Sequence, residues 1–182
     1  MNQGRLSVAI IGAGPVGSVL GQALASAGHM IAGIASTNPK NIERAETMLP
    51  GALVKTLPQL LELADLVLFA IPADQLEATI GGISEAKLWR SGQLVAHTAG
   101  QFGYSVFNSA AQQGVIPLAI HPAMSFTGTS VDLLLDDIRI LPPGARTIVV
   151  SAASRGLAVS SSPTDLRGAG DGITPFRRCL AD

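Results

Sequence analysis

Apolar and polar positions alternate along the chain in blocks that predict strands and helices in turn. Short apolar runs bounded by glycine, proline or polar residues predict buried strands, and they span Leu6–Ile11, Met30–Ser36, Ala64–Pro72, Gly92–Gly100 and Gly114–Pro122. Apolar residues three or four positions apart predict helices, which span Pro15–Ala27, Asn38–Leu49, Leu57–Leu63, the stretch from Ala73, and about Tyr104–Gln113. Strands that alternate with helices at this spacing need crossover connections. We therefore predict an α/β fold, with a doubly wound, mostly parallel sheet in a three-layer αβα arrangement.

The last quarter of the chain lacks this alternation. From Arg139 onward it is rich in Arg, Ser, Gly and Pro, and only Thr147–Val150 and Leu157–Val159 have the apolar character of short strands. Such a composition is typical of irregular segments. We expect one domain over residues 1–140 and an irregular or truncated segment over 141–182. A change of reading frame after about Ile140 is an alternative interpretation of the same composition.

Composition and charge exclude several classes of partner. A net charge of -1 and an aromatic content of 4% argue against nucleic acid or an anionic membrane as partner. The single cysteine, Cys179, excludes an intrachain disulfide, which fits a reducing compartment. The uncharged stretch between Arg5 and Lys40 has the hydrophobicity of an export signal, but its repeated glycines interrupt any continuous helix. We therefore expect a cytoplasmic protein.

The sequence GAGPVG fills the turn between the first predicted strand and the first predicted helix. Its residues are Gly12, Ala13, Gly14, Pro15, Val16 and Gly17. In this pattern the first glycine permits a tight turn, the second lets the backbone approach a pyrophosphate, and the third lets the helix pack closely on the strand. The start of the following helix offers free N–H groups to the phosphates. We predict that these six residues bind a dinucleotide, and a glycine-rich turn without a ligand is the alternative.

The end of the second predicted strand indicates which dinucleotide binds. NAD-binding domains usually place an acidic residue here, where it bonds to the ribose 2′-hydroxyl. This chain has no acidic residue before Glu43 and presents Ser36, Thr37, Asn38 and Lys40 instead. Hydroxyls, an amide and a cation suit a 2′-phosphate, which a carboxylate would repel. The pattern favours NADP(H) over NAD, although it lacks the bidentate arginine that binds phosphate most strongly. Asn38 also fits the cap of the next helix.

With these motifs in place, the chain resembles a family of bacterial two-domain oxidoreductases that combine a Rossmann-like domain with a helical domain. The resemblance covers about Leu6–Asp136 and is carried by VAIIGAGPVGSVLGQALASAGH, ADLVLFAIPADQL, VAHTAG and LAIHPAMSFTG. More distantly, the chain is similar to prephenate dehydrogenase, pyrroline-5-carboxylate reductase and deazaflavin-dependent NADP reductases. The resemblance implies that Ile71, Pro72 and Ala73 contact the cofactor. It also implies a second domain that completes the substrate cleft and a homodimer interface, whereas the segment that follows the matching region here has no helical pattern.

Two histidines are candidates for chemistry. His97 and His121 end predicted parallel strands, at the edge where α/β sheets bind ligands, and we expect Thr98, which follows His97, to contact the cofactor there. Histidine moves protons near neutral pH, as hydride transfer to a carbonyl or imine requires. Each histidine could instead be a hydrogen-bonded core residue. His29, after the first helix, fits a surface or capping role, and two histidines without an acid or cysteine at a suitable spacing do not make a metal site.

These patterns together predict an NADP(H)-dependent oxidoreductase that transfers a hydride to or from a small carbonyl, imine or hydroxy substrate. A dinucleotide-binding or redox-sensing module without catalysis is the alternative. The motifs identify the cofactor half of such a site and leave the substrate unspecified, because specificity lies in side chains outside them.

Overall fold

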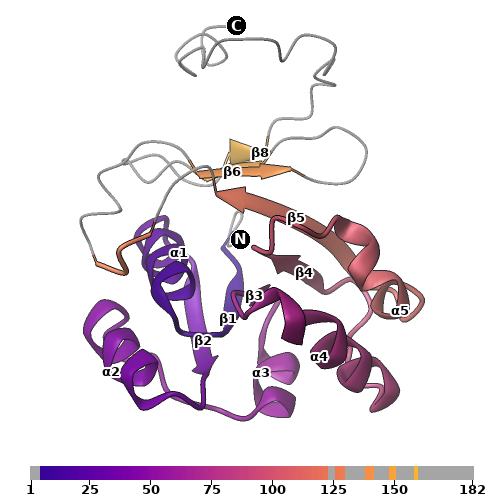
Figure 1. The fold of residues 1–182 in the computed structure, drawn as a ribbon, viewed down its shortest axis with the longest axis horizontal. Helices are drawn as coiled ribbons and strands as arrows, with labels where there is room; N and C mark the ends of the chain where they lie inside the picture. The colour runs from indigo at the N-terminus through magenta and orange to yellow at the C-terminus, as the bar shows by residue number, and fades with distance from the viewer. Residues whose placement is uncertain (1–4, 123–125, 130–137, 142–147, 151–157, 160–182) are drawn as a thin grey trace, which may run out of the picture.

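Strands and helices alternate through the first 122 residues, in the order that the hydrophobic pattern predicts (Figure 1). The computed structural model describes residues 5–122, 126–129, 138–141, 148–150 and 158–159, and in strands beyond residue 118 it describes the backbone alone. The strands are β1 (Ser7–Ile11), β2 (Met30–Ala35), β3 (Leu66–Phe69), β4 (Leu94–His97), β5 (Ile116–Pro122), β6 (Ile138–Leu141), β7 (Ile148–Val150) and β8 (Ala158–Val159). The helices are α1 (Pro15–Ser26), α2 (Pro39–Met48), α3 (Leu57–Leu63), α4 (Ala73–Glu85), the short 3-10 helix η1 (Tyr104–Phe107) and α5 (Asn108–Ala111).

Five parallel strands form the body of the sheet, in the order β2-β1-β3-β4-β5. The chain runs outward from β1 to β2 and then returns to β3 on the other side of β1, which makes the sheet doubly wound and confirms the predicted fold class. β6, β7 and β8 continue the sheet as antiparallel strands. β7 and β8 correspond to the two short strands predicted in the last quarter, whereas β6 was not predicted. The rest of the segment expected to be irregular lies outside the described residues.

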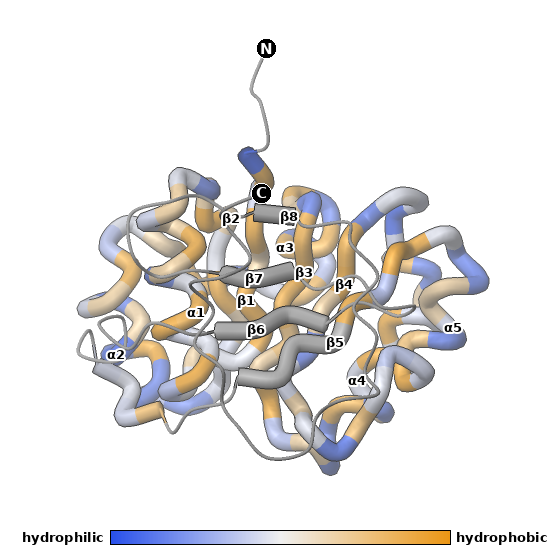
Figure 2. The backbone as a smooth tube through the Cα atoms, turned by 90° about the horizontal axis from the view of Figure 1, so that it is seen from above, coloured by the Kyte–Doolittle hydropathy of each residue, from blue (hydrophilic) through white to orange (hydrophobic). Residues whose placement is uncertain are grey.

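Helices cover both faces of the sheet and divide its core in two. The strand side chains alternate between the faces, so that in β1 Val8 and Ile10 belong to the cluster beneath α1 and α2. Ala9 and Ile11 belong to the cluster beneath α3, α4 and α5. Figure 1 shows the two groups of helices on opposite sides of the strands, and Figure 2 shows the apolar strands between them. Within the described residues, none of the helices combines the length and apolar character needed to cross a bilayer.

Local capping interactions set the C-terminal end of α1 and the start of α2. α1 stops because Gly28 adopts a φ of +89° and the N–H of His29 bonds back to the carbonyl of Leu24 at 3.0 Å. α2 begins at the predicted cap, where Asn38 Oδ1 accepts from the N–H of Lys40 at 3.0 Å. Both ends therefore follow from local sequence signals.

Tertiary contacts shift two other boundaries from the predicted positions. β3 begins at Leu66 and not at Ala64, because the N–H of Ala64 still bonds to the end of α3. Asp65 then places its Oδ2 where it accepts from the N–H of Ser7 at 2.9 Å. The single helix predicted from Tyr104 begins as η1 and continues as α5, which ends at Ala111. The elements exist as predicted, but their bounds depend on neighbours distant in the sequence.

A short segment hydrogen-bonds the outer side of β2. Ile34 donates its N–H to the Leu53 carbonyl and accepts from the N–H of Lys55. The ammonium of Lys55 donates to the Ala32 carbonyl at 2.6 Å. Gly33 has a φ of +151°, and an added Cβ there would lie 2.7 Å from the Leu53 oxygen, so only glycine fits. The chain therefore covers part of its own sheet edge.

Candidate functional site

The carboxyl ends of the parallel strands lie level with one another. Strand register pairs Ile11 with both Ala35 and Phe69, and Phe69 with His97. The glycine turn after β1, the turn after β2, the loop after β3 and Thr98 after β4 therefore share one edge of the sheet. This is the edge at which doubly wound sheets bind nucleotides. The structure brings the predicted cofactor residues to this edge, although they are far apart in the sequence.

Two of the three glycines in the turn after β1 are required by the fold itself. Gly12 has a φ of +97°, and an added Cβ would lie 2.4 Å from the Ala70 carbonyl oxygen. Gly17 passes so close to the turn that an added Cβ would lie 1.9 Å from the Gly12 oxygen. Ser18 strengthens the same junction by donating its hydroxyl to the Ala13 carbonyl at 3.0 Å. These contacts join the start of α1 to the ends of β1 and β3.

Gly14 differs, because nothing in the described part of the chain requires a glycine there. Its φ is −69°, which any residue adopts, and the atom nearest to an added Cβ is Asn41 Nδ2 at 3.9 Å. Gly14 is the N-cap residue of α1, and no side chain caps that helix. A helix start with a bare backbone and an open approach fits a pyrophosphate. The residues present therefore suit the nucleotide that the motif predicts.

The turn after β2 presents polar groups at the same edge. The N–H of Asn38 lies 3.4 Å from Ser36 Oγ, and Asn38 uses its side-chain oxygen to cap α2. Thr37 and Lys40 are exposed beside them. Of the four residues predicted to select a 2′-phosphate, Asn38 thus has a structural role as well, as the sequence indicates. Cofactor contact by these four residues stays a prediction.

The loop after β3 borders the glycine turn. The Cγ2 atom of Ile71 lies 2.9 Å from the position of a Cβ on Gly12. Pro72 occupies the N-cap position of α4 and Ala73 is its first residue. Thr98 extends β4 by donating its N–H to the Phe69 carbonyl at 3.1 Å. Ile71 is therefore beside the predicted pyrophosphate position, where the resemblance implies a cofactor contact.

His97 ends β4 with its ring fully buried. Its Nε2 lies 3.1 Å from the Gly103 carbonyl oxygen, and because a carbonyl can only accept, Nε2 carries the proton and donates it. The ring also packs against Phe107, with centroids 5.5 Å apart. His97 thus ties the loop after β4 to the core, which is the structural alternative that the sequence leaves open. Its catalytic role stays a prediction.

The other two histidines lie elsewhere in the sheet. His121 belongs to β5 and pairs by register with Arg139 of β6, but its side chain lies outside the described part, so its catalytic role also stays a prediction. His29 is buried rather than at the surface, and its Nδ1 accepts from the N–H of Leu6 at 3.0 Å. The predicted surface location is therefore wrong, and the ring ties the end of α1 to the start of β1. Desolvation by burial lowers the pKa of His29 below its usual 6.5.

Two residues that the sequence motifs do not single out, Asn41 and Arg44, lie beside the glycine turn. Asn41 Nδ2 is the atom nearest to the open position at Gly14, and Arg44 Nη1 donates to Asn41 Oδ1 at 3.0 Å. Residues three apart lie on the same side of a helix. Because the sequence predicts a helix from Asn38, the spacing of three residues between Asn41 and Arg44 could have placed both side chains on one face of that helix.

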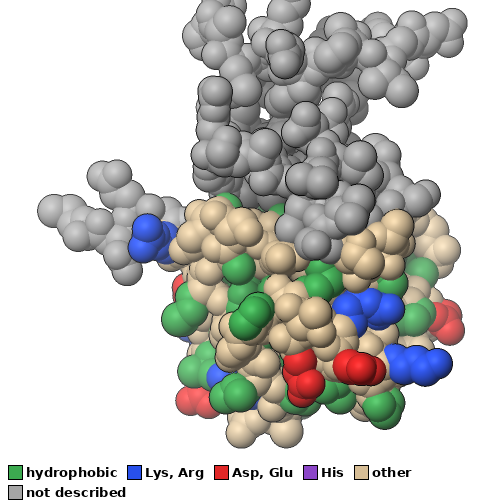
Figure 3. All heavy atoms as spheres, turned by 90° about the vertical axis from the view of Figure 1, so that its left-hand side faces the viewer, with side chains coloured by type: hydrophobic (Ala, Val, Ile, Leu, Met, Phe, Trp, Pro, Cys, Tyr) green, Lys and Arg blue, Asp and Glu red, His purple; other side chains and the backbone are tan. Residues whose placement is uncertain are grey.

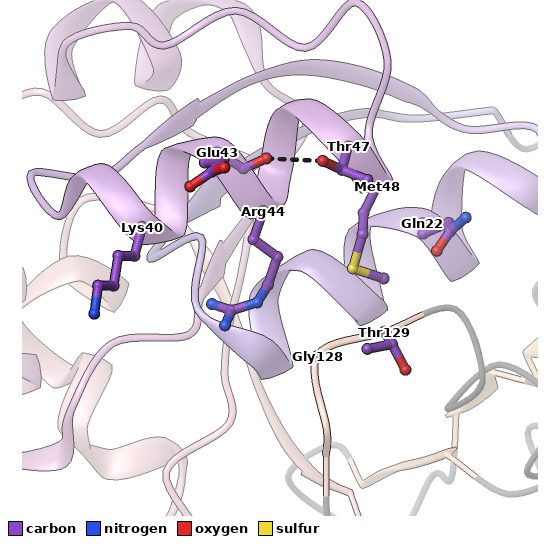
Figure 4. Close-up of a pocket in the computed structure, with 8 residues that line it drawn as sticks. All are labelled: Gln22, Lys40, Glu43, Arg44, Thr47, Met48, Gly128 and Thr129. Atoms are coloured by element: carbon purple, nitrogen blue, oxygen red, sulfur yellow. Dashed lines mark hydrogen bonds between the residues drawn. The ribbon is translucent and has the colours of Figure 1, made fainter.

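A cavity of about 580 Å³ opens between α1 and α2 next to this pair (Figure 4). It is lined by Gln22, Lys40, Glu43, Arg44, Thr47, Met48, Gly128 and Thr129. Figure 4 shows Arg44 extending from α2 toward Gly128. Gly128 packs tightly there, since an added Cβ would lie 2.9 Å from Arg44 Nε and 3.0 Å from Pro15 Cα. Figure 3 shows acidic and basic side chains close together on this side of the molecule.

Solved structures share the fold of this chain at low sequence identity. A protein from Bacteroides fragilis that is named an NADP oxidoreductase is 19% identical, with a TM-score of 0.60 over 81% of this chain and 52% of its own. Prephenate dehydrogenase from A. aeolicus, solved with hydroxyphenyl propionate and NAD+, is 16% identical, with a TM-score of 0.54 over 68% of this chain and 43% of its own. A semialdehyde dehydrogenase NAD-binding protein from Cupriavidus necator is 18% identical, with a TM-score of 0.52 and the same coverage of 68% and 43%. The chain thus spans about half the length of these structures.

Comparison of the sequence with known proteins finds a matching domain family and no matching curated protein. No curated protein matches the chain in sequence. A family model for the Rossmann-like domain, however, matches residues 1–122, which contain β1 to β5 and all the predicted cofactor residues. The chain belongs to the Rossmann-like domain family.

Proposed function

We propose that the chain binds NADP(H) across the carboxyl edge of its sheet and acts as an oxidoreductase on a small carbonyl, imine or hydroxy substrate. The observation that carries this proposal is the open backbone at Gly14. The fold explains Gly12 and Gly17 without a ligand, but it does not explain Gly14. A bound pyrophosphate would need the space that a side chain there would fill. The names of the similar structures, an NADP oxidoreductase and prephenate dehydrogenase, support the same class.

The residues after β2 favour the phosphorylated nucleotide. A carboxylate at this position would accept from the ribose hydroxyls of NAD and would repel a 2′-phosphate. The chain has Ser36 and Thr37 there, with Lys40 exposed in the first turn of α2. The first acidic residue, Glu43, lies further along α2. The charge pattern therefore supports NADP(H) over NAD(H).

The bound nicotinamide would exchange a hydride with a carbon atom of the substrate. The balancing proton needs a donor or acceptor nearby, and His97 and His121 are the proposed candidates. For His97 to donate its Nε2 proton to a substrate, that N–H must leave the Gly103 carbonyl in the loop after β4. In the structure this proton is engaged, and His97 ties the loop after β4 to the core.

A dinucleotide-binding module without turnover is the second candidate function. The burial of His97 favours it, because the ring is 0% exposed and its Nε2 proton is already engaged. The two functions share the cofactor site and differ in one respect. Only the oxidoreductase consumes NADPH when a carbonyl or imine acceptor is supplied.

Nucleotide binding tests the cofactor proposal directly. We expect the purified protein to enhance the fluorescence of NADPH on binding, and to bind NADH several-fold more weakly. Gly14→Ala should fold, because its φ is ordinary and an added Cβ meets no atom closer than 3.9 Å. The methyl group would nevertheless fill the approach to the backbone and weaken NADPH binding by about tenfold or more, the equivalent of one lost charge-assisted hydrogen bond.

Gly81→Ala is the matched control. Gly81 lies in α4, with nothing within 4 Å of an added Cβ, and its substitution should leave the affinity for NADPH unchanged. If the unaltered protein bound neither NADPH nor NADH, the proposed function would be refuted. Unchanged affinity in Gly14→Ala would refute the role assigned to the open backbone. Incubation of NADPH with a panel of carbonyl and imine acceptors then separates the oxidoreductase from the non-catalytic module.

A further inference from the structure

One amide side chain of α2 lies between the glycine turn and an arginine. Asn41 Nδ2 is 3.9 Å from the position of a Cβ on Gly14. Asn41 Oδ1 accepts from Arg44 Nη1 at 3.0 Å. Both residues are partly buried. The amide therefore links the candidate phosphate site to a guanidinium on the same helix.

The chemistry of the two side chains determines which way the amide points. A guanidinium has N–H donors and no acceptor. Arg44 can therefore bond only to the side-chain oxygen of Asn41. If the amide were flipped, its NH₂ group would face the N–H groups of Arg44 and no hydrogen bond could form. The NH₂ group of Asn41 thus lies on the side of Gly14, 3.9 Å from the position of a Cβ there.

Arg44 is held in place from its other side and brings a positive charge to the site. Gly128 packs over it, with an added Cβ only 2.9 Å from Arg44 Nε. Within the described part of the chain, no acidic side chain forms an ion pair with Arg44, although Glu43 lines the same cavity. The partly buried guanidinium of Arg44 and the NH₂ group of Asn41 together favour the binding of an anion.

We propose that Asn41 is a specificity-determining residue that donates to the 2′-phosphate of the cofactor, and that Arg44 is its positioning residue. The inference rests on the proposed NADP(H) function and names the side chains that carry its selectivity. The Asn41 N–H donates to the Asn38 carbonyl at 3.0 Å, in the turn after β2 where the ribose binds in such domains, and its side-chain nitrogen lies beside the glycine turn, where the pyrophosphate binds. A ribose without a phosphate would gain little from these donors.

Asn41→Asp tests the proposal with a minimal change. A carboxylate keeps the contact with Arg44 and suits the first turn of a helix, so the variant should fold. It replaces the NH₂ donors with an oxygen that repels phosphate. We expect the Kd for NADPH to rise about 10- to 100-fold, as for a lost charge-assisted hydrogen bond, while the Kd for NADH changes by less than about threefold. Asn108→Asp makes the same change at an exposed position of α5 and should leave both Kd values unchanged.

Variants of Arg44 separate positioning from folding. Arg44→Met removes the donor that orients the amide and should lower the preference for NADPH over NADH. Arg44→Lys keeps a donor at this position and should restore most of that preference. The readout is the ratio of the two Kd values, which a general loss of stability would not change.

Each outcome decides between the proposals. If the unaltered protein binds neither nucleotide, both this inference and the proposed function are overturned. If it binds NADPH and Asn41→Asp has the same affinity, only this inference is overturned. Equal losses for NADPH and NADH would also overturn it, because they would place the amide at the pyrophosphate that both nucleotides share. Competition by 2′-AMP that is stronger than by 5′-AMP, and that Asn41→Asp abolishes, would support it.

Discussion

Replacing Gly17 with alanine should destabilise the fold, although alanine is the better helix former. The substitution in a helix normally gains about 1 kcal/mol. In the first turn of α1, however, an added Cβ would lie 1.9 Å from the Gly12 carbonyl oxygen and 3.1 Å from Ala70 Cβ. Both neighbours are fixed by the ends of β1 and β3, and neither can rotate away.

The expected magnitude follows from how far the helix would have to move. The start of α1 must shift by more than 1 Å before that contact reaches 3.0 Å, the lower limit for real Cβ atoms. Overpacking of a well-packed core costs about 1–3 kcal/mol, and a contact of 1.9 Å with a backbone oxygen belongs at the upper end of that range, about 2–3 kcal/mol, which exceeds the gain of about 1 kcal/mol in helix propensity. We expect a net loss of about 1–2 kcal/mol for Gly17→Ala and a gain of about 1 kcal/mol for Gly81→Ala, whose surroundings are open. The two substitutions should therefore change the free energy of unfolding in opposite directions.

Urea unfolding followed by circular dichroism measures both free energies. The unaltered protein and the two variants should unfold with similar m-values, so that the shift in midpoint reports stability alone. If Gly17→Ala were as stable as the unaltered protein, the close contact between α1 and Gly12 would be wrong. The packing explanation of the third glycine in the motif would fail with it.

Two histidines give further predictions. Burial lowers the pKa of His29, so the unfolded chain takes up a proton before the folded chain as the pH falls below 6.5, and the urea midpoint should drop there. His29→Gln should flatten that drop because glutamine does not titrate, and its amide oxygen can still accept from the Leu6 N–H. His97→Ala should lower the free energy of unfolding by about 2–4 kcal/mol, through a cavity and the lost donor to Gly103, while NADPH titration shows that binding persists. His97→Gln keeps a donor and should recover stability in part, and turnover that recovers with it would assign His97 a positioning role.

The positions of the central strands were predictable because their signal is local. Every residue of β1, from Ser7 to Ile11, is buried, and a strand covered on both faces reads as a continuous apolar run. The start of β3 was not predictable from such a pattern. Ala64 and Asp65 directly precede the apolar run, but the Ala64 N–H bonds to the Leu60 carbonyl at the end of α3, and the Asp65 side chain bonds to the Ser7 N–H at the start of β1.

The candidate site divides in the same way. The glycine turn and the residues after β2 are contiguous in the sequence, so their chemistry can be recognised in a motif. The link from Arg44 through Asn41 to Gly14 depends on how α2 packs beside α1, which no motif records. The burial of His97 against Phe107 likewise depends on a loop and a helix that follow it in the chain.

The hydrogen bonds on the outer side of β2 limit how copies of this chain can assemble. A second chain that added a strand there would have to displace Leu53 and Lys55 from Ile34, at the cost of two backbone hydrogen bonds and the contact between the Lys55 ammonium and Ala32. Exposed sheet edges commonly join chains by strand pairing, but this one is already partly occupied. A homodimer of the kind that the resemblance implies would therefore not be joined by a sheet continuous across both copies at β2.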